Sequence, residues 1–313
     1  MKKIKVFEAF TGYAGASFGL HYSGLDYEVI GFSEIDKYAI KLLKLNFPTI
    51  HNYGDITQID PTKLPDFDLF TGGFPCQPFS SIGLQDGELD KYGRGTLFYD
   101  IIRILQVKKP SYILLENVKG LTAAKFKPTF DKIIAALQSI GYDVRYQILN
   151  SKDYGIPQNR ERLWIFGYLG KLPDTFTLAP ATIPLTTKFK DVLESNPPSN
   201  YYKTPAQMKL IYKRMRNQSL AVSEPSCLDL YNQHIHTDGL CMTILEPHSN
   251  MYVLEPNDKV RKLTIKEIYR LMGFTDGQMK FGNLSYTQLE TRAGNGWDVH
   301  LTGLLFKHIF SQL

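Results

Sequence analysis

The chain has 313 residues, enough for about two domains, and its 43% of apolar residues can fill a large core. No apolar run reaches the length of about 18 residues that a membrane-spanning helix needs, and no signal-peptide core follows the first lysines. Three cysteines at irregular spacing predict neither a disulfide framework nor a metal site, so we expect a cytoplasmic protein without metal. The net charge of +5 is a mild indication of a polyanionic partner.

Short apolar runs alternate with helical patterns through the first 170 residues or so. The expected strands are Ile4–Ala9, Glu28–Ser33, Asp68–Thr71, Tyr112–Glu116, Val144–Leu149 and Leu163–Tyr168. The expected helices are Ala14–Tyr22, Lys37–Asn46, Leu97–Val107 and Pro128–Ile140. This alternation predicts an α/β fold with a mostly parallel, doubly wound sheet. A short connection with Pro157 joins the last two strands, which favours an antiparallel hairpin at one edge.

The pattern changes beyond residue 170, where prolines become frequent and periodicity is lost. Segment 203–216 carries five basic residues and no acid, and a region of short strands follows to about residue 256. Helical periodicity returns in LTIKEIYRLMGF and in VHLTGLLFKHIF. We therefore expect a first domain over 1–185, a second, irregular domain over 186–285, and a C-terminal segment, 286–313, that returns to the first domain.

Three strand ends carry residues suited to a nucleotide-like cofactor. The first strand leads into FTGYAGASFG, whose glycines let backbone approach a ligand at a helix N-terminus. Glu34, in SEID, lies where an acid can bind ribose hydroxyls, and Asp55, in GDI, can accept from an adenine amino group. The glycine spacing differs from that of dinucleotide-binding folds, which disfavours a nicotinamide dehydrogenase, and no triphosphate-binding motif occurs. The combination indicates S-adenosylmethionine.

The stretch TGGFPCQPFS places Cys76 in a turn stiffened by Pro75 and Pro78. Taken alone, Cys76 is as easily interpreted as a buried structural thiol. The next strand ends in ENVKGL, and the edge strand begins in QNRERLWIFG. Because doubly wound sheets bind ligands at the carboxyl ends of their strands, we expect Cys76, Glu116 and the pair Arg160 and Arg162 to converge beside the cofactor.

With these motifs in this order, the chain resembles the C5-cytosine-specific DNA methyltransferases of bacteria and phages along nearly its whole length. The shared blocks are FTGYAG, SEID, GDI, GGFPCQPFS, ENVKGL, QNRERLWIFG, RKLTIKEIYRLMGF and GNGW, although many bacterial members have GNS or GNA in place of GNG. The resemblance implies methyl transfer from S-adenosyl-L-methionine to carbon 5 of a flipped-out cytosine in a short, specific duplex DNA sequence. It implies S-adenosyl-L-homocysteine as the product and region 186–285 as the target-recognition domain.

The resemblance also assigns the chemistry. Cys76 would add to carbon 6 of cytosine as a thiolate, Glu116 would face N3 of the ring, and Arg162 would bind the carbonyl oxygen. The charges of Arg160 and Arg162 would favour the thiolate. The base that removes the carbon-5 proton is not identified.

Two further groups of residues follow from the resemblance. The cofactor would be bound by Phe10, Tyr13, Gly15, Glu34, Ile35, Asp55, Ile56, Gly73, Pro75 and Asn295. DNA would be contacted by Ile82, Gln85, Lys213, Arg214, Arg216 and Thr243, with Ile82 as a wedge in a glycine-rich loop, residues 80–96, that closes over the substrate. Cys227 and Cys241 are expected in the core.

Alternatives remain open at this point. A tRNA cytosine-5 methyltransferase of the same family would share the catalytic set, and a DNA-binding homologue without activity would lack it. We expect a monomer with double-stranded DNA as partner and a restriction endonuclease as a candidate companion acting on the same site. The recognised DNA sequence is not encoded in these motifs.

Overall fold

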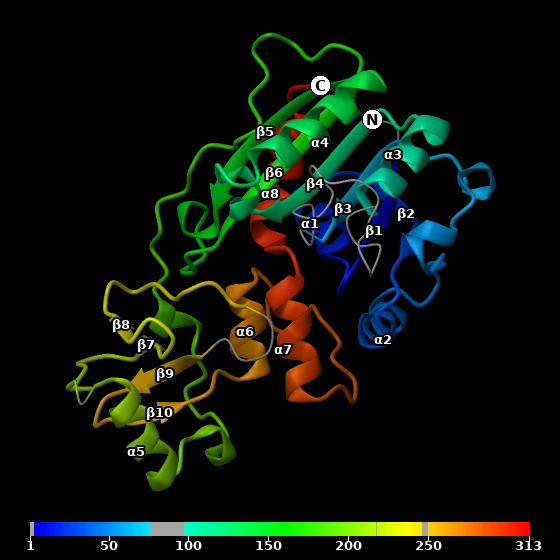
Figure 1. Cartoon of the computed structure of the whole chain (residues 1–313). Coiled ribbons are helices and arrows are strands. Elements are labelled where there is room, and N and C mark those ends of the chain that lie inside the picture. Colours follow the sequence, from blue (N-terminus) through cyan, green and yellow to red (C-terminus); the bar gives the residue numbers. More distant parts are fainter. Residues whose placement is uncertain (1–2, 76–96, 217, 246–249) are drawn as a thin grey trace, which may run out of the picture. The chain divides into compact units, whose positions relative to one another are not determined.

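The computed structural model describes residues 3–75, 97–216, 218–245 and 250–313, and its chain forms two compact units (Figure 1). Unit 1 consists of Met1–Leu149, Glu161–Ala181 and Thr302–Leu313. Unit 2 consists of Asn150–Arg160 and Thr182–Leu301. The functional division at residues 185 and 285 stays a prediction.

Unit 1 contains a six-stranded sheet in the order β2-β1-β3-β4-β6-β5. Its strands are β1 (Ile4–Ala9), β2 (Tyr27–Ser33), β3 (Leu69–Gly73), β4 (Tyr112–Val118), β5 (Tyr142–Asn150) and β6 (Glu161–Leu169). Strands β2, β1, β3 and β4 are parallel, whereas β6 runs antiparallel to β4. The predicted doubly wound α/β sheet with an antiparallel edge is therefore confirmed.

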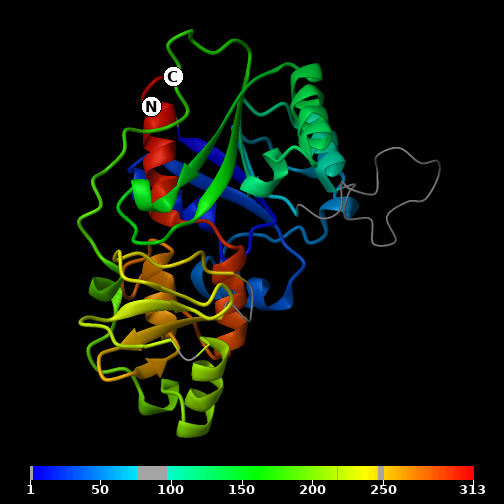
Figure 2. The ribbon, with the colours of Figure 1, turned by 60° about the vertical axis from the view of Figure 1, so that its left-hand side comes forward.

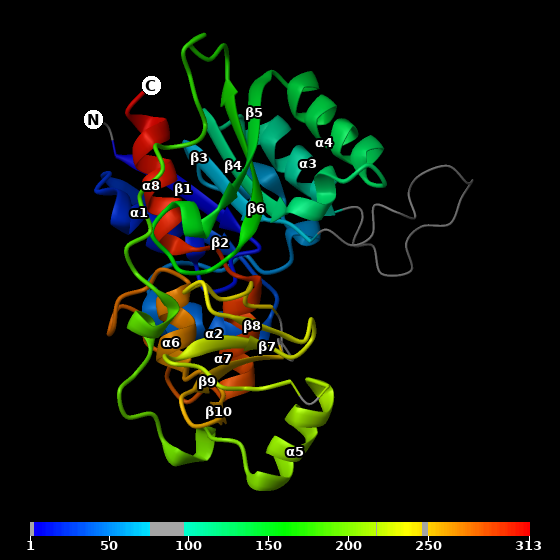
Figure 3. The same ribbon diagram turned by 90° about the vertical axis from the view of Figure 1, so that its left-hand side faces the viewer.

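Helices cover both faces of this sheet, as Figures 2 and 3 show. They are α1 (Gly15–Ser23), α2 (Lys37–Asn46), α3 (Leu97–Lys108), α4 (Lys127–Ser139) and α8 (Val299–Phe310). Alternation along the strands sends Phe7, Phe70 and Ile113 into one core, where α3 and α4 pack. On the other face α1 packs closely against α8. The contact at Gly19 leaves no room for a side chain, since a Cβ there would lie 2.5 Å from the Thr302 side chain.

The turn between β1 and α1 is held by a buried carboxylate, Glu8. Its Oε1 accepts from the amide of Ala16 at 3.1 Å, and its Oε2 accepts from the amide and the hydroxyl of Ser17 at 3.1 and 2.5 Å. Glu8 thus satisfies the amides at the start of α1, which carry partial positive charge. Burial, opposed by these hydrogen bonds, raises the pKa of Glu8 to about 7.

Unit 2 contains a four-stranded antiparallel sheet in the order β10-β9-β7-β8. The strands are β7 (Ser226–Asp229), β8 (His234–His236), β9 (Met251–Glu255) and β10 (Lys259–Arg261); the helices are α5 (Pro205–Arg214), α6 (Ile265–Leu271) and α7 (Tyr286–Asn295). Each helix begins at a capping box, formed by Thr204 and Gln207, Thr264 and Glu267, or Ser285 and Gln288. Across both units, the described residues also contain short 3-10 helices: Ile56–Gln58, Pro61–Lys63, Lys119–Thr122, Ser151–Asp153, Phe189–Val192 and Ser199–Tyr201.

A buried ion-pair network joins β9, β10 and α6 in unit 2. Arg261 binds Glu267 through two hydrogen bonds of 2.8 and 2.9 Å, and its Nε lies 2.6 Å from Glu255. Both Arg261 and Glu267 are almost fully buried. The Glu267 carboxylate also accepts from the amides of Glu194 and Thr264, so its charge is satisfied by four hydrogen bonds in all.

All ten strands and helices predicted for the first 170 residues occur, with ends that differ by at most two residues. The helix predicted in VHLTGLLFKHIF is α8, and LTIKEIYRLMGF contains α6. Helix α7 was missed because YTQLETRAGN is mostly polar and buries only Leu289, Ala293 and Gly294. Its capping pair, Ser285 and Gln288, was the signal that could have revealed it.

Replacing Arg261 with alanine should lower the free energy of unfolding by about 3–5 kcal/mol, because Glu267 is then left buried without a cation. Denaturant unfolding measures this value. The control is Lys127→Ala, which removes an exposed ion pair with Asp131 and should change stability by at most about 0.5 kcal/mol. Equal effects of the two substitutions would contradict this assignment.

The raised pKa of Glu8 predicts a pH dependence of stability. Between pH 4.5 and about 7 the folded chain keeps a proton on Glu8 that the unfolded chain has released. The free energy of unfolding should therefore fall as pH rises through this window, by on the order of 3 kcal/mol, and then level off. Glu8→Gln should lack this component, so the wild-type-minus-variant difference isolates it. A difference that is flat from pH 4 to 8 would refute the prediction.

Candidate active site

Three of the predicted motifs meet where β3 and β4 end and the antiparallel strand β6 begins. These motifs are GGFPCQPFS, ENVKGL and QNRERLWIFG. Gly73, the last residue of β3, is the register partner of Glu116 on β4. Val118, two residues further along β4, is paired with Arg162 on β6. Since β4 and β6 are antiparallel, Glu116 and Arg162 are diagonal neighbours on one face of the sheet.

Glu116 and Arg162 form an ion pair at this edge. Arg162 Nε lies 3.0 Å from Glu116 Oε1, and the two side chains are 14% and 11% exposed. Burial lowers the pKa of Arg162, while the charge of Glu116 raises it. An arginine remains protonated in such a site. The structure thus brings the predicted ring-binding acid and the predicted carbonyl-binding cation into direct contact.

Asn117, the residue after Glu116, fixes the chain where it leaves β3. Its buried amide donates to the carbonyl of Phe74 at 3.0 Å. Phe74 lies two residues before Cys76, and Cys76 itself, like the predicted DNA-contacting residues Ile82 and Gln85 and the loop 80–96, lies outside the described residues. The sequence alone indicated no role for Asn117. The backbone that leads from β3 towards Cys76 is therefore held next to Glu116 by the Asn117 side chain, up to Phe74.

The turn of the predicted cofactor site is conformationally strained. Phe10 and Ala14 adopt left-handed backbone conformations with φ of 51° and 71°. Such conformations are costly for residues other than glycine and cluster at ligand-binding sites. Gly12, also left-handed, donates its amide to Glu34 Oε2 at 2.7 Å. The strained turn is thus tied to the end of β2.

Glu34 is the centre of this region. Besides Gly12, the amides of Ile35 and Asp36 donate to its Oε1, both at 2.8 Å. Burial raises the pKa of Glu34, and these three hydrogen bonds lower it. Its neighbour Ile35 is 72% exposed, unusual for a large apolar side chain.

The other predicted cofactor residues of unit 1 surround the same strand ends. Asp55 caps the 3-10 helix that begins at Ile56, accepting from the amide of Thr57 at 2.9 Å. Ile56 and Tyr13 are buried, and Gly15 begins α1. Gly73 ends β3 and Pro75 is exposed. The cofactor roles of these residues stay predictions.

Arg160 differs from its neighbour Arg162 in its surroundings. It belongs to unit 2 and is 2% exposed. Its guanidinium donates to the carbonyl of Ile244 at 3.0 Å and to those of Gly294 and Gly296 at 3.1 and 2.6 Å. These two glycines flank Asn295, the predicted cofactor residue at the end of α7. The contacts give Arg160 a structural role that the sequence analysis missed, and its predicted effect on the thiolate stays untested.

Thr243, a predicted DNA-contacting residue, and its neighbour Ile244 are bound by Asn159 and Gln158, which directly precede Arg160. Thr243 Oγ1 donates to the carbonyl of Asn159 at 2.6 Å. The amide of Ile244 donates to Gln158 Oε1 at 2.9 Å, and Gln158 Nε2 donates to the carbonyl of Leu271 at 2.7 Å. In the motif QNRERLWIFG, Gln158, Asn159 and Arg160 thus bind backbone groups of unit 2. Arg162 of the same motif binds Glu116 in unit 1.

The basic segment 203–216 contains α5. Lys213 and Arg214 end this helix, and Arg216 follows with a left-handed φ of 53°. Arg214 donates its Nε to the carbonyl of Leu230 at 3.0 Å. In the described part of the chain, none of these three side chains forms an ion pair, so their charges are available to an anionic partner.

The two other cysteines are unsuited to nucleophilic chemistry. Both are fully buried, and burial raises the pKa of Cys227 to about 12 and that of Cys241 well above its usual value. Their expected place in the core is confirmed. Among the described residues there is no cluster of histidine, cysteine and carboxylate side chains fit to hold a metal ion, and no helix there is long and apolar enough to cross a membrane.

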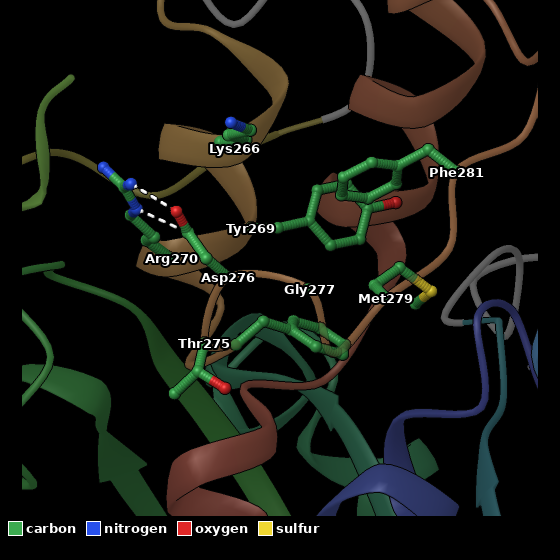
Figure 4. A pocket seen from close by; sticks show the side chains of 9 residues that line it. Lys266, Tyr269, Arg270, Thr275, Asp276, Gly277, Met279 and Phe281 are labelled. Atoms are coloured by element: carbon green, nitrogen blue, oxygen red, sulfur yellow. Dashed lines mark hydrogen bonds and ion pairs between the residues drawn. The ribbon is translucent and has the colours of Figure 1, made fainter.

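One hollow of about 200 Å³ lies beside α6 in unit 2 (Figure 4). It is lined by apolar and aromatic side chains, including Tyr269, Phe274 and Phe281, and Arg270 binds Asp276 at its rim with a 2.7 Å contact. None of the predicted site residues lines it. We therefore interpret it as a packing feature of unit 2.

Known proteins resemble this chain over most of its length. The family model "C-5 cytosine-specific DNA methylase" matches residues 4–311. The type II methyltransferase M.NlaX of Neisseria lactamica is 37% identical over 274 residues, which cover 87% of this chain and 86% of that protein. The type II methyltransferase M.HaeII of Haemophilus aegyptius is 36% identical over 303 residues, covering 96% and 90%.

The solved structures agree on the fold. A DNMT2 from Spodoptera frugiperda superposes with a TM-score of 0.76 over 98% of this chain and all of that chain, at 19% sequence identity. At this identity the likeness shows the fold alone. The family match over nearly the whole length decides the assignment: the chain belongs to the C-5 cytosine-specific DNA methylase family and is a DNA cytosine-5 methyltransferase.

Proposed function

We propose that this enzyme transfers a methyl group from S-adenosyl-L-methionine to carbon 5 of a flipped-out cytosine in a short, specific duplex DNA sequence, through a covalent adduct of Cys76. The observation that carries the proposal is the Glu116–Arg162 pair at 3.0 Å, beside the strand that leads towards Cys76. A carboxyl group and a guanidinium in contact are suited to bind N3 and the carbonyl oxygen of one cytosine ring.

The residues around β1 and β2 fit an adenosine-bearing cofactor. Glu34 accepts three amides, and a carboxylate has about four acceptor positions, so one remains for a ribose hydroxyl. The exposed side chain of Ile35 offers an apolar surface to a purine ring. When bound, S-adenosylmethionine would supply an electrophilic methyl group at this edge of the sheet.

The chain's own groups would carry out the first step. The Cys76 sulfur forms a bond to carbon 6, and the electron pair of the C5–C6 double bond moves to carbon 5, which becomes nucleophilic. Glu116 stabilises the ring at N3, and Arg162 stabilises the carbonyl oxygen. Asn117 holds the Phe74 carbonyl, so the turn that leads towards Cys76 starts from a fixed position.

The second step restores the ring. Once carbon 5 carries the methyl group, a base or water removes the proton that carbon 5 still holds. The electron pair of that bond re-forms the C5–C6 double bond, and the sulfur leaves carbon 6 as a thiolate. Cys76 is thereby regenerated for the next cycle.

Relatives named as type II methyltransferases support a place in restriction and modification. We propose that methylation here protects a site that a companion endonuclease cuts. The target-recognition surface would lie within 186–285, including Thr243.

Cys76→Ala should abolish methylation while leaving the affinity for S-adenosylhomocysteine nearly unchanged, because the thiol does chemistry and other residues bind the cofactor. With wild type, duplex DNA containing 5-fluorocytosine should trap a covalent complex, since fluorine cannot leave carbon 5 as a proton does. Methylation with labelled cofactor and denaturing gels measure both results. Full activity in the alanine variant would exclude the mechanism, and transfer to tRNA with none to duplex DNA would exclude the substrate.

Neutralising Lys213, Arg214 and Arg216 together should weaken DNA binding equally for target and non-target duplexes. Each phosphate contact contributes about 0.9 to the slope of log affinity against log salt, so the triple variant should flatten this slope by up to about three. Titrations at several salt concentrations measure it. The control for the change in net charge is the triple variant Lys63→Gln, Lys127→Gln and Lys171→Gln, which removes three exposed cations of unit 1. An unchanged slope would mean that α5 presents an ordinary solvated surface.

A further inference from the structure

Asn52 lies beside the predicted cofactor residues but belongs to none of the sequence motifs. It sits in a short segment that runs along β2, where Phe32 and Asn52 form a parallel bridge. The amide of Phe32 donates to the carbonyl of His51 at 2.9 Å, and the amide of Tyr53 donates to that of Phe32 at 2.7 Å. This segment leads directly to Gly54 and Asp55.

The side chain of Asn52 binds both the backbone amide and the backbone carbonyl of Glu34. Its Oδ1 accepts from the Glu34 amide at 3.0 Å, and its Nδ2 donates to the Glu34 carbonyl at 3.0 Å. The same Oδ1 accepts from the amide of Gly54 at 3.3 Å. The single side-chain amide of Asn52 therefore satisfies three backbone groups: the N–H and the C=O of Glu34, and the N–H of Gly54.

The position of Glu34 explains why such a side chain is needed. Strand β2 ends at Ser33, so Glu34 lies one residue past the strand. Buried backbone groups need partners, and an asparagine amide can imitate those of a neighbouring strand. A second contact supports the same arrangement, because Ser33 Oγ donates to the carbonyl of Gly54 at 2.8 Å.

We propose that Asn52 is a positioning residue of the cofactor site, which sets the Glu34 carboxylate and the Asp55 segment for the adenosine half of S-adenosylmethionine. This inference rests on the proposed function. Asn52 itself need not touch the ligand: it acts through Glu34, whose carboxylate direction depends on the backbone that Asn52 holds. The geometry assigns it to the adenosine end, since both residues that it connects are predicted there.

The test uses the full chain and the variant Asn52→Ala. Calorimetry should find the dissociation constants of S-adenosylhomocysteine and of adenosine raised by about tenfold or more, and by the same factor, as expected when one positioned hydrogen bond is lost. In methylation assays KM for the cofactor should rise while kcat at saturation stays within about twofold, because the reacting groups are untouched. The matched control is Asn46→Ala, which removes a hydrogen bond to the Leu42 carbonyl in α2 and should leave both constants unchanged.

A double-mutant cycle distinguishes positioning from general damage. Because Asn52 acts mainly through Glu34, Asn52→Ala should cost clearly less affinity in a Glu34→Ala background than in wild type. Additive losses, or an Asn52→Ala protein that binds like wild type, would overturn the inference. Amide hydrogen exchange gives a readout without cofactor: exchange at Glu34 and Gly54 should accelerate in Asn52→Ala and not in Asn46→Ala. If wild type fails to bind any S-adenosyl compound, the proposed function fails, and unchanged exchange separately refutes the role of Asn52.

Discussion

The register of β4 between β3 and β6 is the constraint on which the proposed catalytic arrangement depends. It sets Glu116 beside Gly73 on one side and within reach of Arg162 on the other. A slip of one residue in either ladder would turn Glu116 or Arg162 to the opposite face of the sheet. The antiparallel direction of β6 matters equally, because it brings the start of that strand, where Arg162 lies, to the end of β4. The edge hairpin thus holds one partner of the proposed catalytic pair as well as completing the fold.

A second constraint acts where β1 and β2 end. Glu8 binds the first amides of α1, and Glu34 binds Gly12 in the turn between β1 and α1. Two carboxyl groups therefore hold one short stretch of backbone, and burial together with the charge of Glu34 raises the pKa of Glu8. Above pH about 7, where Glu8 also ionises, this arrangement concentrates negative charge at the turn, which would favour a ligand that carries a positive sulfonium.

The sequence predicted the strands and helices of unit 1 well, because apolar periodicity directly reports which faces are buried. Residues whose chemistry is distinctive, such as Glu116 and Arg162, were also placed together correctly. Arg160 was grouped with Arg162 because they are two residues apart, yet its guanidinium binds carbonyls of Ile244, Gly294 and Gly296 within unit 2. Spacing along the chain could not reveal that the QNRER segment passes from one compact unit to the other between these two arginines.

The structural roles that sequence reasoning missed share one physical task. Asn52, Asn117, Gln158 and Arg160 each bind main-chain groups where a strand or helix stops. At such ends the regular ladder no longer supplies partners, so a side chain must, or the buried group stays costly. Doubly wound sheets place their ligands at these ends. At the strand ends of unit 1, the backbone is therefore held by polar side chains such as Asn52 and Asn117, which apolar patterns cannot signal and which become visible only when each main-chain hydrogen bond is traced.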